Sequence, residues 1–263
     1  MNNHGATRIE SGYRCESGAA RERNEDACLL FMAEFGGHFD LRPLGLFAVA
    51  DGMGGEHEGH VASNAAIRTF GEFVLTNLYF PLLRQRPTPR EADLLDVLER
   101  GVFAAHDAVL RPESAENGGT TLTAGLIFGP RLYVAHVGDS RAYLLAGDEL
   151  RPLTEDHSLV RRLQETGRLS PEAAQNFQYR NVLLQALGQD GALTADTFAL
   201  DLPPVGKLLL CSDGLCGLVP PEDMSAVLRG EEPAQTLADR LYDAAMAAGG
   251  HDNITALVVD FTF

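Results

Sequence analysis

The sequence predicts an α+β fold in which antiparallel β-sheets pack in the middle and helices cover them from outside. Three observations favour this fold class. Apolar runs typical of buried strands occur near the start, in the middle and at the end of the chain. Helical periodicity is confined to separate blocks, so strands and helices do not alternate one by one as in a parallel α/β fold. Glycine-containing dipeptides separate the central strand-like runs, as in hairpins.

The first half of the chain predicts three strands followed by two helices. Residues 8–15 are a weak strand candidate, whereas residues 27–33 and 44–50 are apolar runs bounded by polar residues or glycine. Residues 59–83 carry apolar side chains at helical spacing, and a proline-containing stretch follows them. The same helical spacing returns in residues 92–110.

The second half returns to strands and then adds helices. The expected strands cover residues 120–128, 131–137, 142–146, 149–153, 207–211 and 254–261. Gly129-Pro130 and Gly147-Asp148 are expected to form hairpin turns between them. The expected helices cover residues 159–166, 221–228 and 233–247, the last two with proline near the first turn. Residues 170–180 are polar and are expected to form a surface excursion.

The length of the chain fits one domain. A chain of 263 residues can bury about 73% of its unfolded surface, so one large core needs no disulfide or structural metal. No internal repeat or linker divides the sequence. We therefore expect a flexible N-terminus at residues 1–7 and a single domain over residues 8–263.

The charge balance argues against nucleic acids and anionic membranes as the main partners. The chain has 37 acidic and 21 basic residues, a net charge of −16 and a pI of about 4.8, whereas phosphate-rich partners need a basic face. Residues 1–16 lack the apolar region of a signal peptide, and no apolar stretch approaches a membrane span in length. The four cysteines form no CxxC pair. We therefore expect a reduced, cytoplasmic protein without membrane insertion.

Acidic residues recur where predicted strands begin or end. The set comprises Glu25 and Asp26 before one strand, Asp51 with Gly52, Asp139 and Asp213 after three others, and Asp252 before the last. One Asp-Gly pair after a strand is usually a turn. The recurrence instead indicates that the sheets gather at least six carboxylates at one cleft.

A carboxylate cluster of this kind repels itself strongly unless cations neutralise it. Oxygen ligands without cysteine or organised histidine favour Mg²⁺ or Mn²⁺. Two such ions bridged by a carboxylate can orient and deprotonate a water for attack on phosphorus. Arg21, four residues before Glu25, can then grip the phosphate through two hydrogen bonds.

Seven segments, taken in order, carry a family resemblance. They are residues 21–26, 47–55 with 61–63, 119–121, 137–141, 153–158, 210–215 and 252–255. They resemble the motifs of type-2C, metal-dependent serine/threonine protein phosphatases, and most closely the bacterial branch. The resemblance runs from about residue 8 to residue 261. It implies a central β-sandwich flanked by helices on both sides (αββα), a two-metal centre at one end and a small flap near residues 165–182.

The resemblance implies a role for each candidate metal ligand. Asp51 would bridge two Mn²⁺ or Mg²⁺ ions, and the Gly52 carbonyl would bind one of them. Asp213 and Asp252 would hold one ion. The other ion would be held by Glu25 directly and by Asp26 through water. Asp139 and Asp213 match the positions that bind a weaker third ion.

The resemblance also concerns residues that do not bind metal. Arg21 matches the arginine that binds the substrate phosphate, and Asn253 is expected to shape its loop. Met53 stands where animal members often carry a histidine proposed as general acid, which leaves that role unassigned here. A water on the third ion is the preferred proton donor, with His57 the next candidate.

The leading interpretation is an Mg²⁺- or Mn²⁺-dependent enzyme that hydrolyses phosphoserine and phosphothreonine in proteins in one step, opposing a serine/threonine kinase. Two alternatives stay open. An inactive member could serve as a phosphoprotein-binding module, although every matched metal-binding side chain is acidic. A hydrolase of another class, such as a phosphodiesterase, could use a similar site, although the complete motif order disfavours it.

Overall fold

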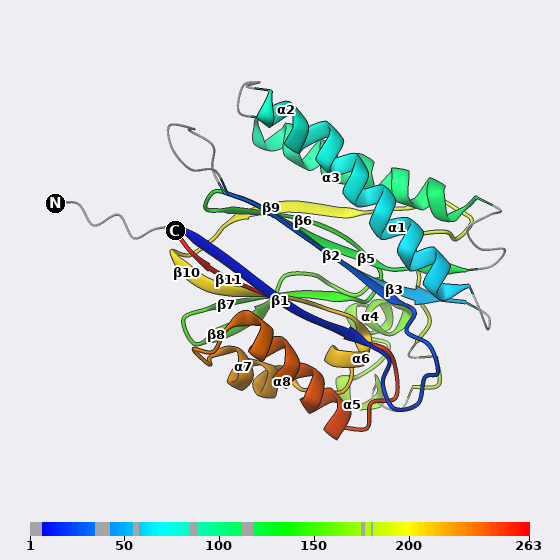
Figure 1. The fold of residues 1–263 in the computed structure, drawn as a ribbon. Helices are drawn as coiled ribbons and strands as arrows, with labels where there is room; N and C mark the ends of the chain where they lie inside the picture. Colours follow the sequence, from blue (N-terminus) through cyan, green and yellow to red (C-terminus); the bar gives the residue numbers. More distant parts are fainter. Residues whose placement is uncertain are drawn as a thin grey trace.

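Two antiparallel β-sheets form the centre of the computed structural model (Figure 1). The first sheet has the order β1 (Arg8–Glu16), β11 (Ile254–Thr262), β10 (Val205–Cys211), β7 (Arg141–Ala146) and β8 (Glu149–Pro152). The second has the order β2 (Asp26–Ala33), β3 (Leu44–Met53), β5 (Leu122–Phe128), β6 (Arg131–Val137) and β9 (Asp196–Asp201), and β4 (Gly119–Thr120) pairs with the end of β3.

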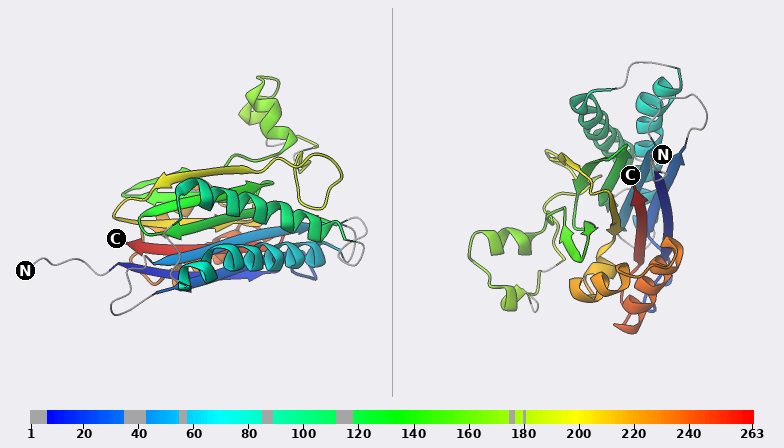
Figure 2. Two further views of the ribbon diagram at one scale, coloured as in Figure 1. Left: turned by 90° about the horizontal axis from the view of Figure 1, so that it is seen from above. Right: turned by 90° about the vertical axis from the view of Figure 1, so that its left-hand side faces the viewer.

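Helices cover both outer faces, which completes four layers and confirms the predicted αββα arrangement (Figure 1). The second sheet carries α1 (Gly59–Val74), the π-helical turn η1 (Leu75–Tyr79), α2 (Phe80–Leu83) and α3 (Glu91–Val109). The first sheet carries α6 (Asp213–Cys216), α7 (Pro221–Leu228) and α8 (Ala234–Ala247). Two short helices, α4 (Leu159–Glu165) and α5 (Pro171–Ala174), project away from the sandwich (Figure 2). Among the helices that the structure describes, none is long and apolar enough to cross a membrane.

Three apolar clusters fill the spaces between these four layers. Strand β3 shows why the central strands are continuous apolar runs in the sequence. Both of its faces are buried, because alternate side chains enter different clusters. Leu46 and Ala48 pack under α1 and α3, whereas Phe47 and Val49 pack between the two sheets. All four side chains are fully buried. The third cluster lies between the first sheet and helices α7 and α8.

The structure describes residues 7–34, 43–54, 58–84, 89–111, 118–174, 177–179 and 181–263. The flexible N-terminus expected at residues 1–7 therefore lies almost wholly outside the described residues. The predicted flap near residues 165–182 includes undescribed positions, and its described part falls in the projecting segment.

The structure departs from the predicted elements at several places, among them the short helices α5 and α6, which were not predicted. Strand β9 was not predicted, because its residues are half-buried or exposed and the segment lacks an apolar run. The expected strand over residues 120–128 is interrupted at Thr121. The expected helix over residues 59–83 contains a π-helical turn just before Pro81. Proline has no N–H and its ring clashes with the carbonyl four residues earlier, and the wider turn relieves both constraints.

Phe47→Ala tests the packing between the sheets. Phe47 is fully buried, so the substitution should lower the free energy of unfolding by about 3–5 kcal/mol, since it removes buried apolar surface and leaves a cavity. Urea denaturation measures this change. Phe103→Ala, at a side chain that is 39% exposed on α3, is the matched control and should cost at most about 1 kcal/mol. Equal effects of both substitutions would contradict the assignment of this core.

Candidate active site

The antiparallel register of β2 and β3 places Asp26 directly opposite Asp51. The backbone of Asp51 is held on its other side, because its N–H donates to Thr121 Oγ1 at 2.9 Å and its carbonyl accepts from the Thr121 N–H at 2.9 Å. The Gly52 N–H donates to the Glu25 carbonyl at 3.2 Å. A side chain at position 52 would collide with the carbonyls of Glu25 and Gly59, so glycine is required by this close approach.

Seven of the eight predicted site residues line one cavity of about 230 Å³. They are Arg21, Glu25, Asp51, Gly52, Asp139, Asp213 and Asp252. Met53, Gly54, Thr121, Asn181 and Leu183 complete the lining. The strand ends of both sheets therefore bring five carboxylates to one place.

Asp26 is the predicted residue that does not line the cavity, since it is buried beneath it with 5% exposure. Its Oδ2 accepts hydrogen bonds from Ser212 Oγ at 2.7 Å and from Thr255 Oγ1 at 2.6 Å. Its Oδ1 is a buried oxygen without a hydrogen-bond partner among the described residues. Burial raises the pKa of Asp26 to about 7, against the two hydroxyl hydrogen bonds that lower it.

Three of the carboxyl groups that line the cavity, those of Asp51, Asp139 and Asp213, have raised pKa values. Burial is the largest cause of the raised pKa of Asp51, and the charges of Asp26, Asp213, Asp139 and Asp252 add to it. Burial also raises the pKa of Asp139 to about 7 and raises that of Asp213, although a hydrogen bond with Asp51 opposes the shift at Asp213. The cluster therefore holds protons unless positive charge replaces them.

The residues fit hard divalent cations by the chemistry of their donors. The cavity presents carboxylate oxygens from several chain segments, and Asp26 Oδ1 is an unsatisfied oxygen just below it. Within the described ranges, no three His, Cys, Asp or Glu side chains form a ready-made metal-binding group. Mg²⁺ keeps several water ligands and takes few carboxylates directly, so oxygens spread around a cavity suit it.

Arg21 lies at the rim of this cavity and is half-exposed. Its Nη2 donates to Asp252 Oδ2 at 2.8 Å. Asn253, the next residue, holds the segment that carries Arg21: its Nδ2 donates to the Arg23 carbonyl at 2.8 Å, and its Oδ1 accepts from the Glu25 N–H at 2.9 Å. The expectation that Asn253 shapes the loop is thus confirmed.

Several hydroxyl groups support the acidic residues, and the sequence reasoning assigned them no role. Ser212 and Thr255 hold Asp26, Thr121 holds Asp51, and Thr121 Oγ1 lies 2.7 Å from Ser140 Oγ. Ser140 and Ser212 each adjoin a predicted acidic ligand in the sequence, which is the one signal that could have found them.

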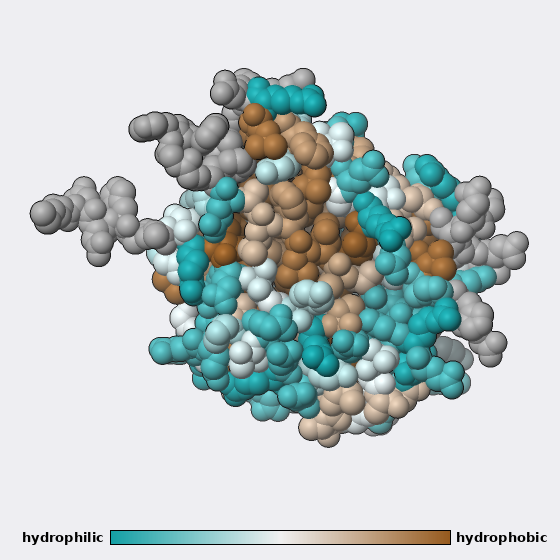
Figure 3. Space-filling model, viewed as in Figure 1, coloured by the Kyte–Doolittle hydropathy of each residue, from teal (hydrophilic) through white to brown (hydrophobic). Residues whose placement is uncertain are grey.

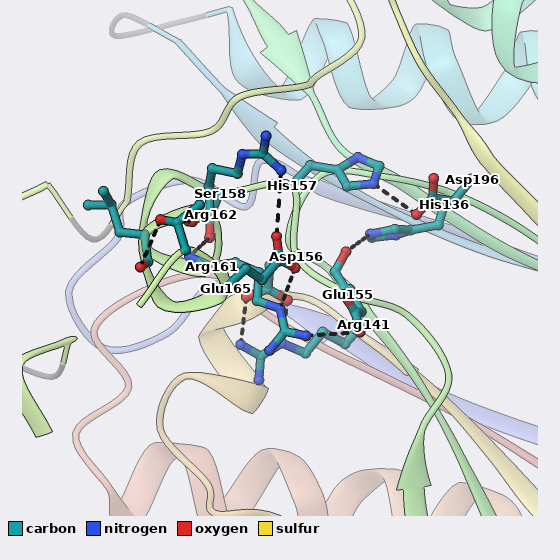
Figure 4. Close-up of polar contacts among 12 residues, drawn as sticks. His136, Arg141, Glu155, Asp156, His157, Ser158, Arg161, Arg162, Glu165 and Asp196 are labelled. Carbon is teal, nitrogen blue, oxygen red and sulfur yellow. Dashed lines mark hydrogen bonds and ion pairs between the residues drawn. The ribbon is translucent and has the colours of Figure 1, made fainter. Parts of the chain in front are cut away.

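A second cavity of about 1080 Å³ adjoins the first and shares Asp139, Asn181, Asp213 and Asp252 with it. Its wall on the side of α4 is a series of ion pairs (Figure 4). Arg141 donates two hydrogen bonds of 2.7 Å to Asp156. Arg161 pairs with Glu155 at 2.9 Å and with Glu165 at 3.1 Å.

The projecting segment is closed at its base by backbone pairing. The Leu159 N–H donates to the Val182 carbonyl at 2.9 Å, and the Leu184 N–H donates to the His157 carbonyl at 2.7 Å. Helix α4 has no buried residue. The segment is therefore joined to the sandwich by a narrow neck and by surface ion pairs.

Two histidines near these cavities, His136 and His157, have structural contacts (Figure 4). His157 Nε2 lies 3.1 Å from Asp196 Oδ2, and its Nδ1 accepts from the Gly138 N–H. His136 is buried, its Nε2 donates to the Glu155 carbonyl, and burial lowers its pKa to about 4. His57, the candidate proton donor, lies outside the described residues.

A family model, sequence relatives and solved structures all match this chain to protein phosphatases. Residues 19–249 match the family model described as protein phosphatase 2C. The chain is 38% identical over 253 residues to the serine/threonine phosphatase stp of Listeria welshimeri, covering 96% of each protein. The structure of the S. agalactiae serine/threonine phosphatase superposes with a TM-score of 0.83 at 27% identity, covering 96% of this chain and 99% of that one. The catalytic domain of the phosphatase PstP in complex with two manganese ions superposes with a TM-score of 0.77 at 32% identity, covering 97% and 99%.

Asp51→Asn tests the electrostatic cost of the cluster in metal-free protein. A carboxyl with a raised folded pKa is protonated in the folded state at a pH where the unfolded chain is not, so its contribution to stability is lost as pH rises from about 4 through the folded pKa. The substitution removes one such carboxyl group. The amide of the new asparagine can still donate a hydrogen bond to Asp213. The variant should melt several degrees above wild type at about pH 8, and this gain should shrink toward about pH 5.

Thermal melts in chelator at both pH values measure this effect. Asp148→Asn, in the exposed β7–β8 turn, is the matched control and should show no pH-dependent gain. A destabilised Asp51→Asn protein at about pH 8 would contradict the repulsion argument.

Proposed function

Since the chain belongs to the protein phosphatase 2C family and is a metal-dependent serine/threonine protein phosphatase, we propose that it hydrolyses phosphoserine and phosphothreonine in proteins with two Mn²⁺ or Mg²⁺ ions and a weaker third. The observation that carries this proposal is the group of five carboxylates around one small cavity with Arg21 at its rim. The manganese bound to PstP supports the choice of metal. The opposing serine/threonine kinase and the cytoplasmic location belong to the same proposal.

The proposed ligands are those that the family resemblance implies. Asp51, on which the charges of Asp26, Asp213, Asp139 and Asp252 all act, would be the shared ligand of the two core ions, and the Gly52 carbonyl would bind one of them. Asp213 and Asp252 would hold one of these ions. Glu25 would hold the other together with Asp26, whose free Oδ1 supports this role. When bound, the ions would supply the positive charge that activates a water and neutralises phosphate oxygens.

Asp139 is proposed as a ligand of the third, weaker ion. It lines both cavities together with Asp213. Asp213 already serves a core ion in this scheme, so the third site has fewer anionic ligands of its own and should bind a hard cation less tightly. A water held at this position is the proposed proton donor to the leaving oxygen of the substrate.

Arg21 is proposed to bind the substrate phosphate. Its guanidinium donates to Asp252 in the structure, and its half-exposed position lets it turn to an anion in the cavity. A guanidinium can bind two phosphate oxygens at once, which orients the phosphoryl group as well as neutralising it. The larger cavity beside Asp139 and Asp213 has room for the peptide that carries the phosphate.

The proposed function is tested by turnover of a phosphothreonine peptide with Mn²⁺, with chelator, and against bis-p-nitrophenyl phosphate. Wild type should hydrolyse the peptide only with metal and should prefer it to the diester. Asp51→Asn should lower turnover by about 1,000-fold or more, because the shared ligand is lost. A protein that binds the phosphopeptide without turnover would be a binding module, and preference for the diester would indicate a phosphodiesterase.

Arg21→Ala should lower kcat/KM for the phosphopeptide roughly 10- to 1,000-fold, since a charge-assisted contact to the phosphate is lost. Calorimetric titration with Mn²⁺ should show nearly unchanged metal affinity. Arg100→Ala, at an exposed arginine paired with Asp96 on α3, is the control and should leave both quantities unchanged. Loss of metal binding in Arg21→Ala would reassign Arg21 to holding Asp252.

A further inference from the structure

Two cysteines face each other where the edges of the two sheets meet. Strands β1 and β2 are edge strands of different sheets, and residues 17–25 connect them. Near the far end of the pair, Ser11 Oγ donates to Met32 Sδ at 3.5 Å. Four residues nearer the connection, on the same face of each strand, stand Cys15 and Cys28. The register set by the Ser11–Met32 contact therefore places these two thiols against each other, close enough to perturb each other's pKa.

The surroundings of Cys15 favour its thiolate. Asn24 Nδ2 donates to Cys15 Sγ at 3.3 Å. The Thr255 hydroxyl lies 3.2 Å from the same sulfur and 2.6 Å from Asp26 Oδ2, so its single proton serves one of the two at a time. The hydrogen bond from Cys28 is the largest cause that lowers the pKa of Cys15, to about 6, and burial opposes it.

The four cysteines differ in exposure and in the surroundings of the sulfur. Cys15, Cys28 and Cys216 are partly exposed, whereas Cys211 is fully buried. The face that carries β1 and β2 is open to view in Figure 3, and apolar side chains gather there in a band that runs from α2 over β2. The interaction with the Cys211 thiol, followed by burial, raises the pKa of Cys216 well above its usual range, which keeps that sulfur protonated. A small oxidant therefore meets a reactive sulfur at Cys15 first.

We propose that Cys15 and Cys28 form an oxidation site for hydroperoxides. The Cys15 thiolate attacks a peroxide oxygen, the O–O bond breaks, and Cys15 becomes a sulfenic acid while the leaving hydroxide takes a proton to form water. The Cys28 sulfur then attacks the Cys15 sulfur, the S–O bond breaks, and a second water leaves. Two thiols have lost two electrons to one hydrogen peroxide, which yields one disulfide and two waters.

The disulfide would act on the active site through the connection between the strands. Residues 17–25 carry Arg21 and Glu25, and the bond would join the two ends of this segment covalently. Asn24 and Thr255, which contact the Cys15 sulfur, also hold Asp26 through its N–H at 3.1 Å and its Oδ2 at 2.6 Å. Oxidation should therefore displace the proposed phosphate-binding residue, Arg21, together with the proposed metal ligands Glu25 and Asp26. This effect rests on the proposed function, whereas the thiol chemistry does not.

The test treats Mn²⁺-loaded protein with hydrogen peroxide and follows free thiols, peptide masses and phosphopeptide turnover. Wild type and Cys211→Ser should lose two thiols, yield a Cys15–Cys28 cross-linked peptide and lose turnover by roughly tenfold or more, with recovery in dithiothreitol. After the same peroxide treatment, Cys28→Ser should form no intramolecular cross-link. Cys15→Ser should keep the phosphopeptide turnover that it had before treatment. Cys15→Ala and Cys28→Ala repeat the test should a serine variant fold poorly.

Three outcomes would overturn the proposal. The first is a cross-link between Cys211 and Cys216 in place of the expected one. The second is equal inactivation of Cys15→Ser, which would assign the damage to another group. The third is a Cys15–Cys28 disulfide that leaves turnover unchanged, which would remove its effect on the site. A protein without phosphatase activity that still forms the cross-link would refute the proposed function and retain the oxidation site.

Discussion

The rest of the site depends on the hydrogen bonds that the Asp26 carboxylate accepts from the other sheet. Asp26 begins β2 in the second sheet, yet its Oδ2 accepts hydrogen bonds from Ser212, which directly follows β10, and from Thr255, near the start of β11, both in or next to the first sheet. The two sheets are thereby held together at the end where both supply acidic residues. Their relative position in turn sets the distance between Asp51, paired with Asp26, and Asp213, which follows Ser212.

The same arrangement makes the site costly for the fold. Several carboxyl groups share a small cavity, and burial and mutual repulsion raise their pKa values. The three apolar clusters provide the stability that offsets this repulsion, because they fill the layers with side chains that are almost entirely buried. Stability and function therefore depend on separate parts of the molecule. The interior of the sandwich provides the stability, and one end of it carries the acidic site.

Much of the fold was predictable, since apolar periodicity is a local property and β3, α7 and β11 show it clearly. Strand β9 was not, because a half-exposed edge strand has no strong pattern of its own. The acidic residues were predictable from their positions at strand ends. Their partners were less so: the contact of Arg21 with Asp252 and the hydroxyls of Thr121 and Thr255 join segments far apart in the chain, and only the tertiary structure brings them together.

The projecting segment with α4 and α5 has a consequence for evolution. It leaves the sandwich through a narrow neck between His157 and Leu184, and α4 contributes no side chain to any apolar cluster. Insertions, deletions and substitutions there can accumulate without repacking the interior. Related chains can therefore come to differ strongly in this segment while selection for a stable scaffold keeps the strands alike.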